Sequence, residues 1–201
     1  MNIRLILIAT LALLGGALAA LIATRPSATP PIQSAGAALV GGPFRLVDQT
    51  GAEKTDESFR GRHMLVVFGY TYCPDICPAE LQVMTAALET LGPEGEQVAP
   101  VFITVDPQRD TPEHLREYMK SFHPRFTALT GSPEATAAAA KAYRVYAAKA
   151  PDSGSAADYL IDHSAFIYLM GPDGRYLTHF AYGVTPEALA RGVRKHLNSG
   201  A

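Results

Sequence analysis

Two cysteines separated by three residues are the part of this sequence best suited to chemistry. Cys73 and Cys77 are the only cysteines among the 201 residues, and Pro74, Asp75 and Ile76 lie between them. A disulfide that stabilises a fold generally closes a longer loop, because its stabilising effect grows with loop length. The pair is therefore expected to act in redox chemistry or in metal binding.

The spacing of the two cysteines favours a site for a soft metal ion. Residues four apart in a helical turn lie on one side of it, so both sulfurs can point at a common centre. Thiolates select Cu(I), zinc or iron–sulfur clusters over hard cations. A closed structural zinc site generally takes four ligands, whereas copper accepts fewer. The pair therefore indicates copper if a third ligand lies elsewhere in the chain.

A redox function stays open for the same pair. The C-x-x-x-C spacing differs by one residue from the C-x-x-C motif of disulfide oxidoreductases. The thiolate is the nucleophile in thiol–disulfide exchange and also the form that binds metals, so an acidic cysteine fits both functions. A metal site needs a further ligand, and a redox site does not.

The candidate for that third ligand is His163. It lies directly ahead of a predicted hairpin strand, and the neighbouring Asp162 is placed to orient or polarise it. The remaining histidines have ordinary interpretations, as a surface residue before a strand, a helix residue, a loop residue, a hairpin residue and a residue of the last helical turn. They are His63, His114, His123, His179 and His196.

The cysteine segment is predicted to join a buried strand to a helix. Residues 64–68, MLVVF, form a continuous apolar run that indicates a buried strand. Residues 79–91 carry apolar side chains at helical spacing. If this helix begins at Pro78, Cys77 lies at or near its N-cap. The helix dipole and free N–H groups there favour a thiolate.

The other predicted elements complete an α/β fold. Three helices share a start signal, in which Ser or Thr is followed by Pro and Glu. Their order predicts a thioredoxin-like fold, a central mixed sheet flanked by helices, in which the loop entering the hairpin lies against the cysteine segment. The elements are strands at 43–48, 98–105 and 126–129, helices opened by Thr111, Ser132 and Thr185 that end near 121, 143 and 197, and a hairpin of 166–170 and 176–180.

The N-terminal part of the chain predicts attachment to a membrane. Residues 5–23 are uncharged and approach the ~20 residues that a membrane-spanning helix needs. We therefore interpret residues 1–25 as a transmembrane anchor or signal segment, with an anchor favoured by the length of the apolar run. Residues 26–42 are rich in Pro, Ser and Ala and predict a flexible linker, and residues 43–201 form the domain. Either interpretation of the N-terminus places the domain outside the cytoplasm.

Composition excludes one class of partner. Hydrophobic residues make up 48% of the chain and charged residues 18%, which is typical of a folded globular domain. The formal net charge is −2, so the chain lacks the basic footprint of a nucleic-acid-binding protein. Nothing in the sequence indicates an obligate dimer, and a monomer is expected.

Three segments together resemble the Sco/SenC family of copper-binding proteins. They are GYTYCPDICPAEL (69–81), TVDPQRDTPEHLREYM (104–119) and YLIDHSAFIYLMGPDGRY (159–176). The resemblance covers residues 43–197 as well as the single N-terminal anchor, and three motifs together are far more specific than C-x-x-x-C alone. It implies a thioredoxin-like fold and the binding of Cu(I) or Cu(II). The family's metal ligands match Cys73, Cys77 and His163.

The resemblance also implies a role and a place. Family members serve in assembly of the binuclear CuA centre of cytochrome c oxidase, so the expected partner is the copper-binding subunit of that oxidase or another copper-receiving protein. The implied function is that of a metallochaperone rather than an enzyme. The domain is expected on the periplasmic side of a bacterial inner membrane, with the mitochondrial intermembrane space as the alternative.

Two other functions use the same cysteines. A thiol–disulfide oxidoreductase that reduces the copper-receiving protein needs Cys73 and Cys77 but not His163. A peroxidase of the peroxiredoxin kind, with Thr71 beside the cysteine, fits the sequence least well. Residues 106–110 are interpreted as a turn fixed by aspartate side chains and an arginine pair.

Overall fold

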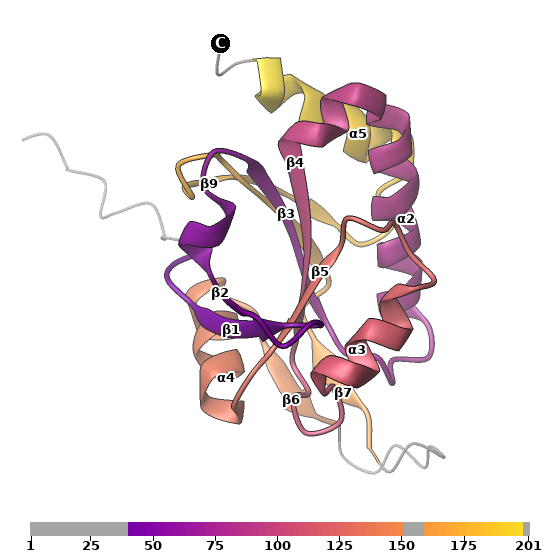
Figure 1. Cartoon of the computed structure of the whole chain (residues 1–201). Helices are drawn as coiled ribbons and strands as arrows, with labels where there is room; N and C mark the ends of the chain where they lie inside the picture. Colours follow the sequence, from indigo (N-terminus) through magenta and orange to yellow (C-terminus); the bar gives the residue numbers. More distant parts are fainter. Residues whose placement is uncertain (1–39, 151–158, 199–201) are drawn as a thin grey trace, which may run out of the picture. The chain divides into compact units, whose positions relative to one another are not determined.

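The structure, a computed structural model, describes residues 40–150 and 159–198 (Figure 1). A seven-stranded sheet with the order β2-β1-β5-β4-β3-β8-β9 forms the centre, and β6 and β7 pair separately. Strands β3, β4 and β5 are parallel, whereas β1 and β8 run antiparallel to their neighbours, so the predicted mixed sheet is confirmed. The strands are β1 (Arg45–Asp48), β2 (Glu53–Thr55), β3 (His63–Gly69), β4 (Val98–Thr104), β5 (Thr127–Thr130), β6 (Ala147–Lys149), β7 (Ile161–His163), β8 (Phe166–Met170) and β9 (Tyr176–Ala181).

Helices cover both faces of the sheet, and β3 is buried between them. The helices are α2 (Ile76–Leu91), α3 (Pro112–Met119), α4 (Pro133–Ala142) and α5 (Pro186–Leu197), with 3₁₀ turns η1 (Asp56–Phe59) and η2 (Gly92–Gln97). Leu65 and Val67 pack in a cluster with side chains of α2, α3 and α5, whereas Val66 and Phe68 pack with side chains of α4. Alternate residues of one strand therefore serve two cores, which is why the run is apolar throughout.

The three helices predicted from the Ser/Thr-Pro-Glu signal begin where expected. The side chains of Thr111, Ser132 and Thr185 each accept a hydrogen bond from the backbone N–H three residues later. Such a cap contributes about 1 kcal/mol, and proline at the first position lacks an N–H that the helix would leave unbonded. The start of α3 is thereby fixed, which matters because this helix lies beside the cysteine segment.

Helix α2 begins earlier than the sequence indicated. Its N-cap is Asp75, so Cys77 is the second helical residue rather than the cap. Pro78 is tolerated inside the first turn, because the first four N–H groups of a helix have no partner within the helix. The cysteine pair therefore spans the junction, with Cys73 before the helix and Cys77 within it.

Three strands were not predicted, and each has three residues: β2, β6 and β7. The strand β7 replaces the expected loop ahead of the hairpin and ends at His163. The predicted anchor (1–25) and all but the last three residues of the predicted linker (26–42) lie outside the described residues. Within residues 40–150 and 159–198, the search for a helix of sufficient length and apolarity to cross a bilayer found none.

Candidate metal centre

Cys73, Cys77 and His163 converge at one end of the sheet. One ligand atom from each residue lies within 4.8 Å of the other two. The Cys77 Sγ atom is 3.2 Å from His163 Nε2, and the Cys77 backbone N–H points at Cys73 Sγ across 3.5 Å. Among the residues that the structure describes, this is the one group of three His, Cys, Asp or Glu side chains placed to hold a metal ion.

Gly69 allows the cysteine helix to approach the sheet. It ends β3, and a Cβ atom at this position would lie 2.8 Å from Cys77 Sγ and 3.0 Å from the Phe102 ring. Any larger residue would push α2 outward. Cys77 is consequently only 2% exposed, whereas Cys73 is half-buried and remains accessible.

The ring of His163 is oriented by its own strand. His163 pairs with Ala147 of β6, and its Nδ1 atom lies 3.2 Å from the Ser164 carbonyl oxygen. A carbonyl can only accept, so Nδ1 carries the hydrogen. In the neutral ring Nε2 then holds the lone pair, and this is the atom that faces the sulfurs. The arrangement suits metal coordination through Nε2.

The two cysteines share one negative charge. Hydrogen bonding from the Cys77 side chain lowers the pKa of Cys73 to about 3, against the opposing effect of burial. The pKa of Cys77 is raised, because its thiol donates to Cys73 and is itself buried. For His163, burial alone would lower the pKa, but hydrogen bonding with Cys73 and Ser164 raises it overall. Metal binding would displace the protons that these groups retain.

A buried glutamate behind the site was not found from the sequence. Glu80 is 3% exposed, and among the described residues neither carboxyl oxygen has a hydrogen-bond partner. Burial raises the pKa of Glu80 to about 7, because an ionised carboxylate without donors is unstable away from water. The available signal was its position, three residues after Cys77 and next to Leu81 on the apolar face of α2.

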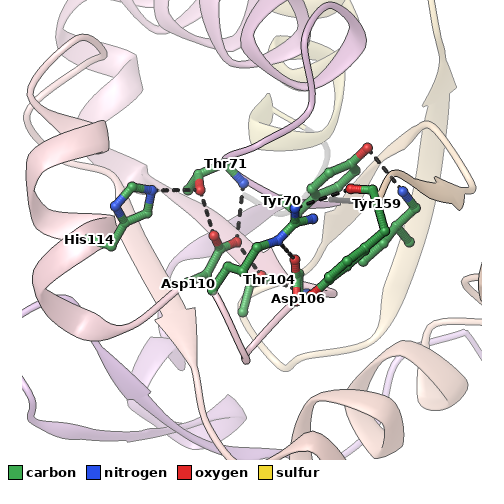
Figure 2. Close-up of polar contacts among 9 residues, drawn as sticks. Tyr70, Thr71, Thr104, Asp106, Asp110, His114 and Tyr159 are labelled. Carbon is green, nitrogen blue, oxygen red and sulfur yellow. Dashed lines mark hydrogen bonds and ion pairs between the residues drawn. The ribbon is translucent and has the colours of Figure 1, made fainter. Parts of the chain in front are cut away.

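Hydrogen bonds also fix the chain directly before Cys73 (Figure 2). The backbone N–H and the hydroxyl of Thr71 donate to the Asp110 carboxylate, which also accepts from the Thr104 hydroxyl. His114 Nε2 lies 2.9 Å from the Thr71 hydroxyl oxygen. The turn at 106–110 does contain the expected Asp106–Arg109 ion pair, but it also reaches the cysteine segment.

The five other histidines stay outside the three-ligand group. His114 is more than an ordinary helix residue, since its ring stacks on Tyr72 with centroids 5.3 Å apart. The expectation of a surface position for His63 was wrong. It is the first residue of β3 and is 9% exposed, because the strand begins one residue earlier than predicted.

Comparisons with known proteins agree with the predicted family. The model of the SCO1/SenC family matches residues 32–198. The mitochondrial SCO1 homolog 1 of Arabidopsis thaliana is 42% identical over 165 residues, which are 82% of this chain and 49% of that protein. The chain thus spans about half the length of this curated relative.

Solved structures agree as well. The copper-bound structure of ScoI from Bradyrhizobium japonicum is 43% identical, with a TM-score of 0.71 over 78% of this chain and 98% of that one. BsSco, a member of the Sco family of cytochrome c oxidase assembly proteins in which a disulfide switch was identified, is 26% identical, with a TM-score of 0.64 over 80% and 94%. The predicted thioredoxin-like fold is confirmed.

Proposed function

Because the chain belongs to the SCO1/SenC family, we propose that it is a copper metallochaperone that assists assembly of the CuA centre of cytochrome c oxidase. Copper would be held by Cys73, Cys77 and His163. The observation that carries this proposal is the convergence of the three ligand atoms within 4.8 Å. The copper-bound structure of a 43% identical relative supports the choice of metal.

The donor set fits both oxidation states of copper. Two thiolates satisfy Cu(I), and an imidazole nitrogen adds a ligand that suits Cu(II). Three ligands leave coordination positions free, and the half-buried Cys73 offers an incoming protein a place to begin ligand exchange. A site of this kind can take up copper and transfer it to another protein without catalysing a reaction.

We also propose a location for the domain and a class of partner protein. The apolar stretch at 5–23 supports a membrane anchor with the domain on its non-cytoplasmic face, and we favour the periplasm. Relatives occur in mitochondria and in bacteria, so the intermembrane space is the alternative. The partner would be the copper-binding oxidase subunit or another copper-receiving protein. Its own cysteines would receive the copper.

A thiol–disulfide reductase is the second candidate, favoured by the acidity of Cys73. Its thiolate would attack a disulfide of the copper-receiving protein and release one thiolate of that protein. Cys77 would then attack the mixed disulfide, so that Cys73 and Cys77 are oxidised to a disulfide and the target is reduced to two thiols. A peroxidase is disfavoured, because the Thr71 hydroxyl is engaged by Asp110 and His114.

Copper titration of the reduced full-length protein separates the candidates. We expect one equivalent of Cu(II), an intense sulfur-to-copper absorption band, and loss of most of that band in His163→Ala. The matched control is His179→Ala, which removes an exposed histidine outside the site. Full-strength Cu(II) binding by His163→Ala would remove it from the ligand set. Rapid Cys73–Cys77 disulfide formation without stoichiometric binding would favour the reductase.

A further inference from the structure

We propose that Arg109 is a positioning residue of the copper site, which links the segment that carries Cys73 to the strand that carries His163. This inference rests on the proposed copper function. Arg109 lies in the turn after β4 and is not one of the three candidate ligands. Besides its ion pair with Asp106, it contacts residues that lie near those ligands in the chain, on both sides of the site.

The guanidinium of Arg109 faces two tyrosine rings from the two ligand segments. Its Cζ atom lies 3.7 Å from the ring centroid of Tyr159 and 4.5 Å from that of Tyr72. Tyr72 directly precedes Cys73, and Tyr159 comes four residues before His163. A planar cation attracts the electron-rich faces of both rings, so this one side chain contacts both segments.

Two hydrogen bonds add to the ring contact in fixing Tyr159. The Arg109 Nη1 group donates to the Tyr159 carbonyl oxygen at 3.1 Å, while Arg109 Nε is paired with the Asp106 carboxylate. The Tyr159 hydroxyl donates to the other Asp106 oxygen at 2.8 Å (Figure 2). Ring, carbonyl and hydroxyl of Tyr159 are thus all held by the turn at 106–110. Because the Arg109 side chain is only 16% exposed, water competes little with these contacts.

Other contacts also hold the strand that carries His163, but they are short-range. Strand β7 has three residues, and among the described strands it pairs with the three-residue β6. Backbone hydrogen bonds of Leu160 and Ser164 extend this pairing, and the Ile161 N–H donates to the Tyr70 hydroxyl at 3.1 Å. The hold on Tyr159 at the start of this segment adds to these contacts in placing His163 against the sulfurs.

The two copper oxidation states should depend on Arg109 to different degrees. Cu(I) is satisfied by the two thiolates, which keep supports of their own in α2 for Cys77 and in the Thr71–Asp110 hydrogen bonds before Cys73, whereas Cu(II) also needs the imidazole. Loss of a group that orients a ligand typically lowers metal affinity 10- to 100-fold. Without the Arg109 contacts, Cu(II) affinity should fall by about this factor, and Cu(I) affinity should change less than about threefold.

The test is Arg109→Lys in the full-length protein, with Arg116→Lys, at an exposed position of α3, as the matched control. Lysine keeps the charge beside Asp106 but lacks the planar face and the second nitrogen, which in Arg109 donates to the Tyr159 carbonyl oxygen. We expect Cu(II) affinity to fall about 10- to 100-fold, nitrogen hyperfine splitting in the electron paramagnetic resonance spectrum to weaken, and Cu(I) affinity to hold. Unchanged Cu(II) affinity and splitting, or equal losses for both ions, would overturn the proposal.

A second readout needs no copper. Hydrogen exchange of the Ile161 amide in the apo protein should accelerate in Arg109→Lys and not in Arg116→Lys. If the parent protein binds no copper but this acceleration is seen, the proposed function fails and the positioning role of Arg109 stands. If Arg109→Lys does not fold, Tyr159→Leu removes the stacked ring from the other side and decides by the same measurements, with Tyr182→Leu, at an exposed tyrosine, as its control.

Discussion

At the scale of single residues, the buried carboxyl of Glu80 is the least expected group beside the metal centre. The side chain is 3% exposed, and no described residue donates a hydrogen bond to either oxygen. A carboxyl in such surroundings stays neutral well above the pH at which an exposed glutamate ionises, because burial raises its pKa. Glu80 thus keeps extra negative charge away from two cysteines that already share one thiolate.

The titration of Glu80 should make the apo protein less stable as the pH rises. Its pKa is about 7 in the folded protein and near 4.5 in the unfolded chain. Between these values the unfolded chain releases a proton that the folded protein retains, so the contribution of Glu80 to the free energy of unfolding falls with rising pH, by about 3 kcal/mol in total. Cys73, whose pKa is lowered on folding, acts in the opposite direction in both proteins, so urea unfolding between pH 4.5 and 8 measures the loss as the difference between the parent protein and Glu80→Gln.

The matched control for that prediction is Glu89→Gln, which changes an exposed glutamate of the same helix. Its unfolding free energy should follow that of the parent protein across the pH range. If the curves of Glu80→Gln and the parent protein ran parallel from pH 4.5 to 8, the neutral form of Glu80 would have no part in stability.

At the scale of elements, the contact between the end of β3 and the first turn of α2 determines where Cys77 lies. Gly69→Ala would place a methyl group 2.8 Å from Cys77 Sγ. Helix α2 would have to shift, at a cost of about 1–3 kcal/mol in unfolding free energy, and copper affinity should fall with it. Urea unfolding and copper competition measure the two effects on the same sample.

Gly131→Ala is the matched control for the strand-end glycine. It directly follows β5, and its added Cβ would meet a Leu46 methyl group at 3.0 Å, away from the cysteines. It should change stability without changing copper affinity. Equal copper affinity in Gly69→Ala and the parent protein would show that α2 moves without disturbing the sulfurs.

Local signals in the sequence predicted most of the elements, and contacts between distant segments account for what was missed. The apolar run at 64–68 and the Thr185 start signal each need only a few neighbouring residues to be recognised. The strands β6 and β7 are too short for an alternating pattern, and they exist because they pair with each other. Their position could not be derived without the folded chain.

The convergence of Cys73, Cys77 and His163 was predictable to a similar extent. Cys73 and Cys77 follow from spacing, but His163 is 86 residues beyond Cys77 and was selected by its place before the hairpin and by the family resemblance. The role of Arg109 was missed, because a turn fixed by an arginine–aspartate pair explains its sequence context fully. Its contacts with Tyr72 and with Tyr159, the latter 50 residues away, are visible only in the folded chain.

At the scale of the whole molecule, the candidate ligands come from two distant segments that only the folded chain brings together. An unfolded chain still offers the two nearby sulfurs of Cys73 and Cys77, but not the distant imidazole of His163. Cu(II) should therefore bind the folded state more tightly and stabilise it by mass action. The gain should stay below the ~4 kcal/mol that a thousandfold excess of free copper over the dissociation constant would give if the unfolded chain bound none.

That stabilisation should depend on His163. In anaerobic urea unfolding with Cu(II), the parent protein and His179→Ala should both show a clear rise in the unfolding midpoint. In His163→Ala, Cu(II) should raise the free energy of unfolding by less than about 1 kcal/mol, because the folded and unfolded states then offer copper the same two sulfurs. A chelator added afterwards should return the parent protein to its apo midpoint. An equal rise in the parent protein and in His163→Ala would mean that His163 adds nothing to the Cu(II) affinity of the folded state.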